Sequence, residues 1–197
     1  MTNYSLKFKA LSVLLAVTMA FTACTSSWVA QAQAIVAILG PAVGVILNLI
    51  AAFGGKTVPL QDVAFVQTWT QQLQTDFGII GQLLDKYNAA EATAKPGILT
   101  EIDTALQTAQ GQLNQLLPAL HITDVATVAK VTSLIGAVIS SVESLMQLVA
   151  IAQGKAAGKR AVKAQNAKSF KAEFNARLVA ASGNAALDAV AASLVLK

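Results

Sequence analysis

Three stretches of this chain repeat apolar residues at alternating spacings of three and four, and this period constrains the fold more than any other feature. They cover residues 63–87, 99–120 and 125–149. A period of 3.5 residues keeps one apolar stripe along a helix, which suits near-antiparallel packing of neighbouring helices. The sequence therefore predicts helices at about 60–88, 98–118 and 124–153.

Short connections separate these stretches, and each contains a residue that ends or begins a helix. Gly54 and Gly55 end the segment that precedes Pro59, residues 88–97 form the second connection, and Pro118 disturbs the end of the next helix. Helices joined by such short connections run in opposite directions. With residues 28–53 as the remaining long helix, we expect an all-α fold: an antiparallel helical bundle of about four long helices with a short helical basic C-terminal segment.

The first of these helices is free of charge. No charged residue occurs from Thr25 to Gly55, and the strongly apolar part, residues 35–53, is nearly long enough to cross a membrane. Gly40, Gly44 and Asn48 recur every four residues and would form one helix-association face. One interpretation is a membrane-inserted or membrane-lying helix that self-associates. The other, which we favour, is a buried central helix that is kinked or broken at Gly40 and Pro41.

The N-terminus is typical of an export signal that ends in a lipidation motif. Two lysines precede an apolar run of twelve residues, 10–21, which is too short to span a bilayer. The run ends in Phe21-Thr22-Ala23-Cys24, which resembles the lipobox of bacterial lipoproteins. That resemblance implies a signal peptide over residues 1–23 and attachment of a fatty acid such as palmitate to Cys24, the mature N-terminus. Otherwise Cys24 is a free thiol behind an ordinary signal cleaved near Ala23.

The resemblance also implies where the protein resides. Thr25, in place of Asp, resembles lipoproteins that are sorted to the periplasmic face of the outer membrane. We then expect a domain over residues 24–153, the helical bundle, anchored to the membrane through Cys24. Residues 154–197 form a basic, alanine-rich tail. The mature chain is only weakly charged, since charged residues are 12% of the sequence and apolar residues 55%.

The tail gathers most of the basic residues of the mature chain. In an exported protein, such charge favours contact with anionic lipid, lipopolysaccharide or peptidoglycan rather than nucleic acid. The alternative is a solvated helix face or a flexible segment. The candidate contact residues are Lys155, Lys159, Arg160, Lys163, Lys168, Lys171 and Arg177.

No pattern of residues predicts catalysis, a metal or a cofactor. His121 is the only histidine and Cys24 the only cysteine, whereas a zinc site takes three or four ligands. The sequence therefore favours a lipid-anchored structural or interaction protein of the cell envelope, with a protein partner or self-association, and not an enzyme. The alternative is a membrane-active helical protein (a pore, a holin-like protein or a transport accessory) that uses the 35–53 helix.

Overall fold

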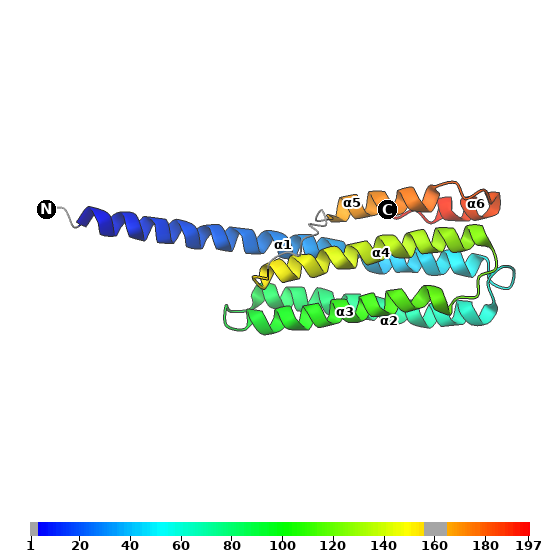
Figure 1. The fold of residues 1–197 in the computed structure, drawn as a ribbon, viewed down its shortest axis with the longest axis horizontal. Helices are drawn as coiled ribbons and strands as arrows, with labels where there is room; N and C mark the ends of the chain where they lie inside the picture. Colours follow the sequence, from blue (N-terminus) through cyan, green and yellow to red (C-terminus); the bar gives the residue numbers. More distant parts are fainter. Residues whose placement is uncertain (1–3, 156–164) are drawn as a thin grey trace.

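The computed structural model describes the backbone of residues 4–155 and 165–197, and the side chains of residues 28–155 and 165–197. Over this part of the chain the structure is helical without strands, apart from an isolated bridge between Gly54 and Val58. The predicted all-α class is therefore confirmed. The helices (Figure 1) are α1 (Tyr4–Ala52), α2 (Leu60–Ala89), α3 (Lys95–Ala119), α4 (Val125–Ala152), α5 (Ala167–Val179) and α6 (Ala185–Ser193).

Local chemistry explains where these helices begin and end. Gly55 adopts a φ of 73°, a left-handed conformation that suits the turn after α1. The α3 helix starts before the expected residue 98, because Pro96 fits a first helical turn, where no backbone N–H is needed. At the start of α4, the Asp124 carboxylate accepts the Thr127 N–H at 2.7 Å and the Thr127 hydroxyl at 2.6 Å. This cap supplies an acceptor for a backbone N–H with no partner inside the helix.

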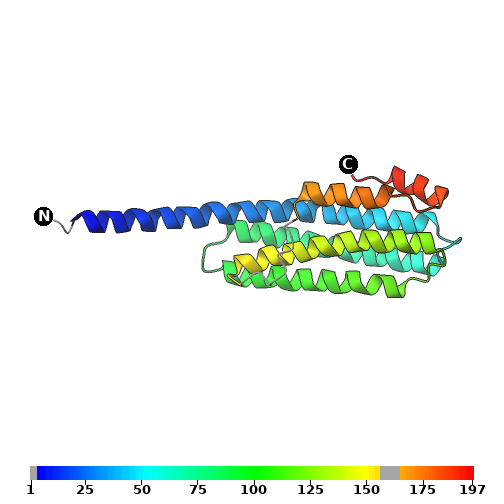
Figure 2. The same ribbon diagram turned by 45° about the horizontal axis from the view of Figure 1, so that its top comes forward.

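The first helix differs from its expected form. It begins at Tyr4, and it continues through Pro41 as one helix instead of breaking there. Proline leaves the carbonyl four residues earlier without a donor, but Pro41 and Ala37 are both exposed, so water can reach that carbonyl. The first part of α1 extends beyond the ends of the other helices (Figure 2).

The α1 and α3 helices each pack against both α2 and α4 (Figures 1 and 2). Hydrogen bonds between α1 and α2 record the relative direction of the two helices. Gln33 donates to Asp85 at 2.6 Å, and Gln74 donates to the Gly40 carbonyl oxygen at 3.4 Å. Since residue numbers rise along α1 as they fall along α2, the two helices are antiparallel.

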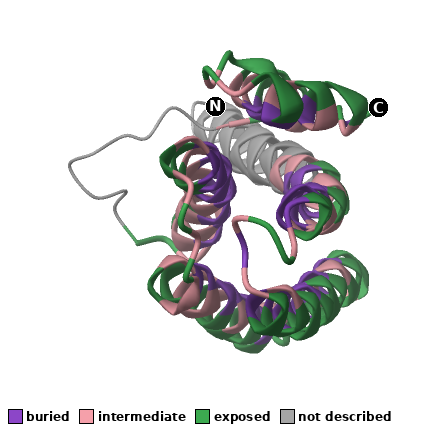
Figure 3. Ribbon diagram, turned by 90° about the vertical axis from the view of Figure 1, so that its right-hand side faces the viewer, coloured by how far each residue is buried: buried purple, intermediate pink, exposed green. Residues whose placement is uncertain are grey.

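The apolar residues of the four long helices face one another (Figure 3). The heptad positions of α2 and α3 are almost all buried, as the period predicts. The uncharged part of α1 is a core element. Its fully buried side chains are Ile35, Leu39, Ala42, Val43, Ile46, Leu49 and Ile50.

In α4 the heptad stripe is only part of the buried surface. Val125, its first member, is 81% exposed, because it directly follows the helix cap. A second apolar face on α4 is also covered, since this helix packs against α1, α3 and α5. The buried residues of that second face are Val131, Leu134, Val138 and Leu145.

The two short C-terminal helices lie along the outside of α1 and α4 (Figure 2). The α5 helix inserts Phe170, Phe174 and Leu178, all fully buried, and α6 adds Leu187 and other apolar side chains. The amphipathic pattern of the C-terminal segment therefore reflects docking within the chain.

Candidate functional site

The candidate anchor, Cys24, lies within α1, and its side chain is outside the described residues. It precedes Trp28, the first described side chain, by four positions, or about 6 Å along a helix axis. Trp28 packs edge-on against Tyr87 near the end of α2, with ring centroids 5.3 Å apart. We call the end of the molecule formed by Trp28, the end of α2, the start of α3 and the end of α4 the anchor end.

A groove of about 330 Å³ opens at the anchor end, between the start of α3 and the end of α4. Its polar residues include Lys95, Thr100, Gln153 and Lys155. The Lys95 ammonium lies 5.1 Å from the centroid of the Tyr87 ring, within the range of a cation–π contact. Burial raises the pKa of the Tyr87 phenol, so this group is neutral at physiological pH. The groove therefore holds one cation, Lys95, over a neutral aromatic ring, and a second, Lys155, lines the same groove.

The predicted association face lies at the α1–α2 contact. The Gln74 side chain covers it: a Cβ placed on Gly44 would meet the Gln74 amide nitrogen at 3.6 Å. Asn48, one turn further, is exposed. Beside these residues is a shallow groove of about 340 Å³, which Gly40, Gln74 and Gly78 help to line. The side chain of Gln74 therefore already covers part of the predicted association face.

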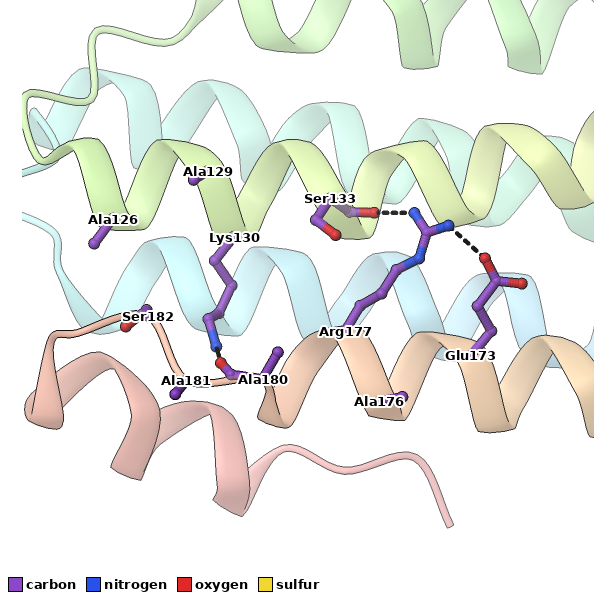
Figure 4. Close-up of a pocket in the computed structure, with 10 residues that line it drawn as sticks. All are labelled: Ala126, Ala129, Lys130, Ser133, Glu173, Ala176, Arg177, Ala180, Ala181 and Ser182. Carbon is purple, nitrogen blue, oxygen red and sulfur yellow. Dashed lines mark hydrogen bonds and ion pairs between the residues drawn. The ribbon is translucent and has the colours of Figure 1, made fainter.

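A larger groove, of about 530 Å³, lies between α4 and α5 (Figure 4). Its charged residues bind within the chain. Arg177 donates to the Ser133 carbonyl oxygen at 2.8 Å and pairs with Glu173. The Lys130 ammonium donates to the carbonyl oxygens of Leu178 and Ala180. These bonds hold α5 against α4.

The seven predicted basic contact residues differ in how the structure places them. Lys155 and Lys168 are exposed and Lys171 is half-buried, whereas the Arg177 guanidinium is engaged as described above. The remaining three, Lys159, Arg160 and Lys163, lie outside the described residues.

The lone histidine joins the connection between α3 and α4 to the start of α2. The His121 N–H donates to the Asp62 carboxylate at 2.5 Å, and its Nδ1 lies 3.3 Å from the other carboxylate oxygen. Asp62 is buried at the start of α2, whereas the His121 ring is largely exposed. Among residues 28–155 and 165–197, no group of three or more His, Cys, Asp or Glu side chains could hold a metal ion.

Sequence reasoning missed Lys130, the most buried cation of the described residues. Its side chain is 3% exposed, and its ammonium also lies 3.3 Å from Asp188. In the sequence, its position is marked only as a lysine that interrupts the apolar surface of α4, next to Val131. That position could not identify the partners, since all of them come from residues 48 or more positions later.

Within residues 28–155 and 165–197, two helical segments are long and apolar enough to cross a membrane: Trp28–Ala52, which is part of α1, and Val125–Ala152. In each, half of the most apolar window is buried within the protein. Comparisons of the chain with protein-family models, curated proteins and solved structures found no match.

Proposed function

We propose that this chain is a lipid-anchored structural or interaction protein of the bacterial cell envelope. Residues 1–23 are the signal peptide, and acylated Cys24 is the mature N-terminus, at the periplasmic face of the outer membrane. The body is an antiparallel bundle of four long helices that carries α5 and α6 on its side. Its work is to hold a partner or a second copy near the membrane, without catalysis.

The burial of α1 is the observation that carries this proposal. The helix that a membrane-active protein would insert supplies seven fully buried side chains of the core. Withdrawing them would expose the facing sides of α2 and α4, since both pack on α1. Burial of each valine, leucine or isoleucine among them is worth roughly 1.5–3 kcal/mol. Insertion of α1 into a membrane would therefore disrupt most of the core, whereas a scaffold function requires no movement of α1.

The engagement of polar groups within the chain supports the same proposal. The buried acids Asp62 and Asp76 accept hydrogen bonds from His121 and Gln112, respectively. The buried Lys130 is bound to backbone carbonyls. These polar groups hold the helices together. They therefore maintain the surface of packed helices that a partner would bind.

A membrane-active role remains the second candidate, because one side of α1 is exposed and uncharged. That side carries Ala34, Ala37, Pro41 and Asn48. Small residues of this kind allow close helix approach in lipid. This candidate predicts that the protein releases dye trapped in vesicles, whereas a scaffold leaves the vesicles sealed.

Metabolic labelling tests the anchor. The chain is expressed in a bacterium supplied with radiolabelled palmitate, beside the variants Cys24→Ser and Thr25→Ser. We expect label in the wild type and in Thr25→Ser, which keeps the thiol, and no label in Cys24→Ser. Equal labelling of all three proteins would contradict acylation at Cys24.

A further inference from the structure

We propose that the groove at the anchor end binds the phosphate of an anionic phospholipid headgroup, in the membrane that holds Cys24. This inference rests on the proposed acylation of Cys24. It adds that the protein stands on the membrane by its anchor end, instead of swinging freely on its lipid.

The position of the groove is the first reason. Cys24 lies about 6 Å along the α1 axis from Trp28, so acylation holds the anchor end close to the headgroups. The groove opens at this end, between α3 and α4. The α3 helix packs on α2 and α4, across the body from α1. A headgroup held there would therefore give the body a second membrane contact, which fixes its tilt.

The charge of the groove is the second reason. Lys95 and Lys155 line it, and the described residues that line it include no carboxylate. Of the acids near it in the chain, Glu101 pairs with Lys86 at 3.3 Å and Asp85 accepts a hydrogen bond from Gln33. Glu91, next to Ala92 of the groove wall, is exposed and does not line the groove. An anion in the groove thus meets two ammonium groups, each worth about a fivefold gain in binding at an anionic membrane surface.

The apolar side chains near the groove are the third reason, and they favour a lipid over a soluble anion. Ile151, in the last turn of α4, is 58% exposed, four residues before Lys155. Trp28, half-buried, supplies an aromatic ring at the same end, packed on the buried ring of Tyr87. Aromatic rings beside lysines are typical of the level of lipid headgroups, where the rings meet the acyl boundary and the ammonium groups meet phosphate.

A fluorescent probe in the groove tests this contact in the acylated protein. Cys24 is the only cysteine and acylation blocks its thiol, so Ala92→Cys, in the groove wall, gives one site for labelling. The protein is reconstituted in vesicles of phosphatidylcholine, alone or with phosphatidylglycerol, that contain a nitroxide headgroup quencher. We expect strong quenching only with phosphatidylglycerol. Replacing both groove lysines (Lys95→Gln with Lys155→Gln) should lower the ratio of seated to free protein by about 25-fold.

A matched double variant controls for net charge. Lys56→Gln with Lys197→Gln removes the same charge from exposed residues in the α1–α2 connection and after α6, and should leave quenching unchanged. Equal quenching in both vesicle types, or an equal loss in both double variants, would overturn the proposal. Should the groove variant fail to fold, added sodium chloride should release the wild-type probe from quenching, and no release would overturn it too.

Two further arms separate related outcomes. Inorganic phosphate, compared with chloride at matched ionic strength, should release no additional protein from the seated state. Greater release by phosphate would assign the groove to a soluble anion and overturn the lipid contact. A chain that carries no fatty acid and does not incorporate into vesicles would contradict the proposed function itself, which is a different result from incorporation without quenching.

Discussion

The Lys130 ammonium on α4 donates to the Leu178 carbonyl oxygen, 2.9 Å away, near the C-terminal end of α5. The same ammonium also bonds the Ala180 carbonyl and lies 3.3 Å from the Asp188 carboxylate, at the start of α6. A buried charge is tolerable when hydrogen bonds replace its hydration, and carbonyls at a helix C-terminus have no partner inside the helix. Lys130 therefore joins the C-terminal helices to the body.

Lys130→Met should destabilise the protein by about 2–3 kcal/mol, because it removes charge-assisted hydrogen bonds and leaves buried carbonyl oxygens without donors. The measurement is urea unfolding followed by circular dichroism. Lys168→Met, on the exposed side of α5, is the matched control and should shift stability by less than about 0.5 kcal/mol. Equally small effects in both variants would show that the bonds of Lys130 contribute little to the free energy of unfolding.

Asp188 links the same contact to acid stability. Hydrogen bonds from Ser182, with a smaller effect of Lys130, lower the pKa of the Asp188 carboxyl. A lowered pKa in the folded state gives stability that is present above the ordinary aspartate value and is lost as the pH falls through the folded value. Stability should therefore decline below about pH 4, and Asp188→Asn should flatten that decline. The test is urea unfolding at a series of pH values.

Asp124 provides an independent check of the same principle at the start of α4. Hydrogen bonds from Thr127 lower the pKa of its carboxyl. Asp124→Asn keeps a capping side chain but removes the titrating group, so it should also reduce the acid-dependent loss of stability. A pH profile unchanged in both asparagine variants would mean that other carboxylates dominate acid unfolding.

The period of apolar residues predicted the buried stripes of α2 and α3 and the bounds of α2 to within a residue, whereas α3 begins three residues before the expected position 98. Val66, Leu73 and Leu106, for example, lie in the core as expected. Helix-breaking residues were less informative: the break that Pro41 allowed in α1 is absent, because its exposed position lets the helix continue. In the uncharged and evenly apolar part of α1, the local sequence does not show which side will meet water.

The bonds of Lys130 and Arg177 that hold α5 against α4 could not be predicted for a related reason. The sequence indicated that the segment of α5 is amphipathic and basic. It did not indicate whether Arg177 faces an anionic surface or a carbonyl oxygen of the same chain. Its bond to Ser133 depends on how α5 crosses α4. Likewise, the groove lysines Lys95 and Lys155 are 60 residues apart in sequence and meet only through the packing of α3 and α4.

Gly44→Ala tests how closely α1 and α2 approach. A Cβ at Gly44 would meet only the Gln74 amide nitrogen, at 3.6 Å, which is ordinary van der Waals contact with the end of a flexible side chain. Alanine also restricts the unfolded chain and favours helix, so the variant should be more stable by about 0.5–1 kcal/mol in thermal or urea unfolding. A loss of stability would indicate tighter α1–α2 packing than this geometry allows.

Leu49→Lys distinguishes the scaffold from the membrane-active candidate. Leu49 is fully buried on α1, so a lysine there would place an unpaired ammonium in the core and remove apolar packing. The scaffold predicts a loss of at least about 3–5 kcal/mol, measured by thermal melting of the mature chain without its fatty acid. Val45→Lys, at another buried position of α1, should behave in the same way.

Asn48→Lys is the matched control for Leu49→Lys, because residue 48 is the adjacent position in the same helix and is exposed. A lysine there extends into water and should leave the melting temperature nearly unchanged. A membrane-lying α1 predicts the opposite result for the buried sites: Leu49→Lys would melt like the wild type but bind vesicles more weakly. Since both variants add one charge to neighbouring residues, only the burial of α1 accounts for a difference in melting between them.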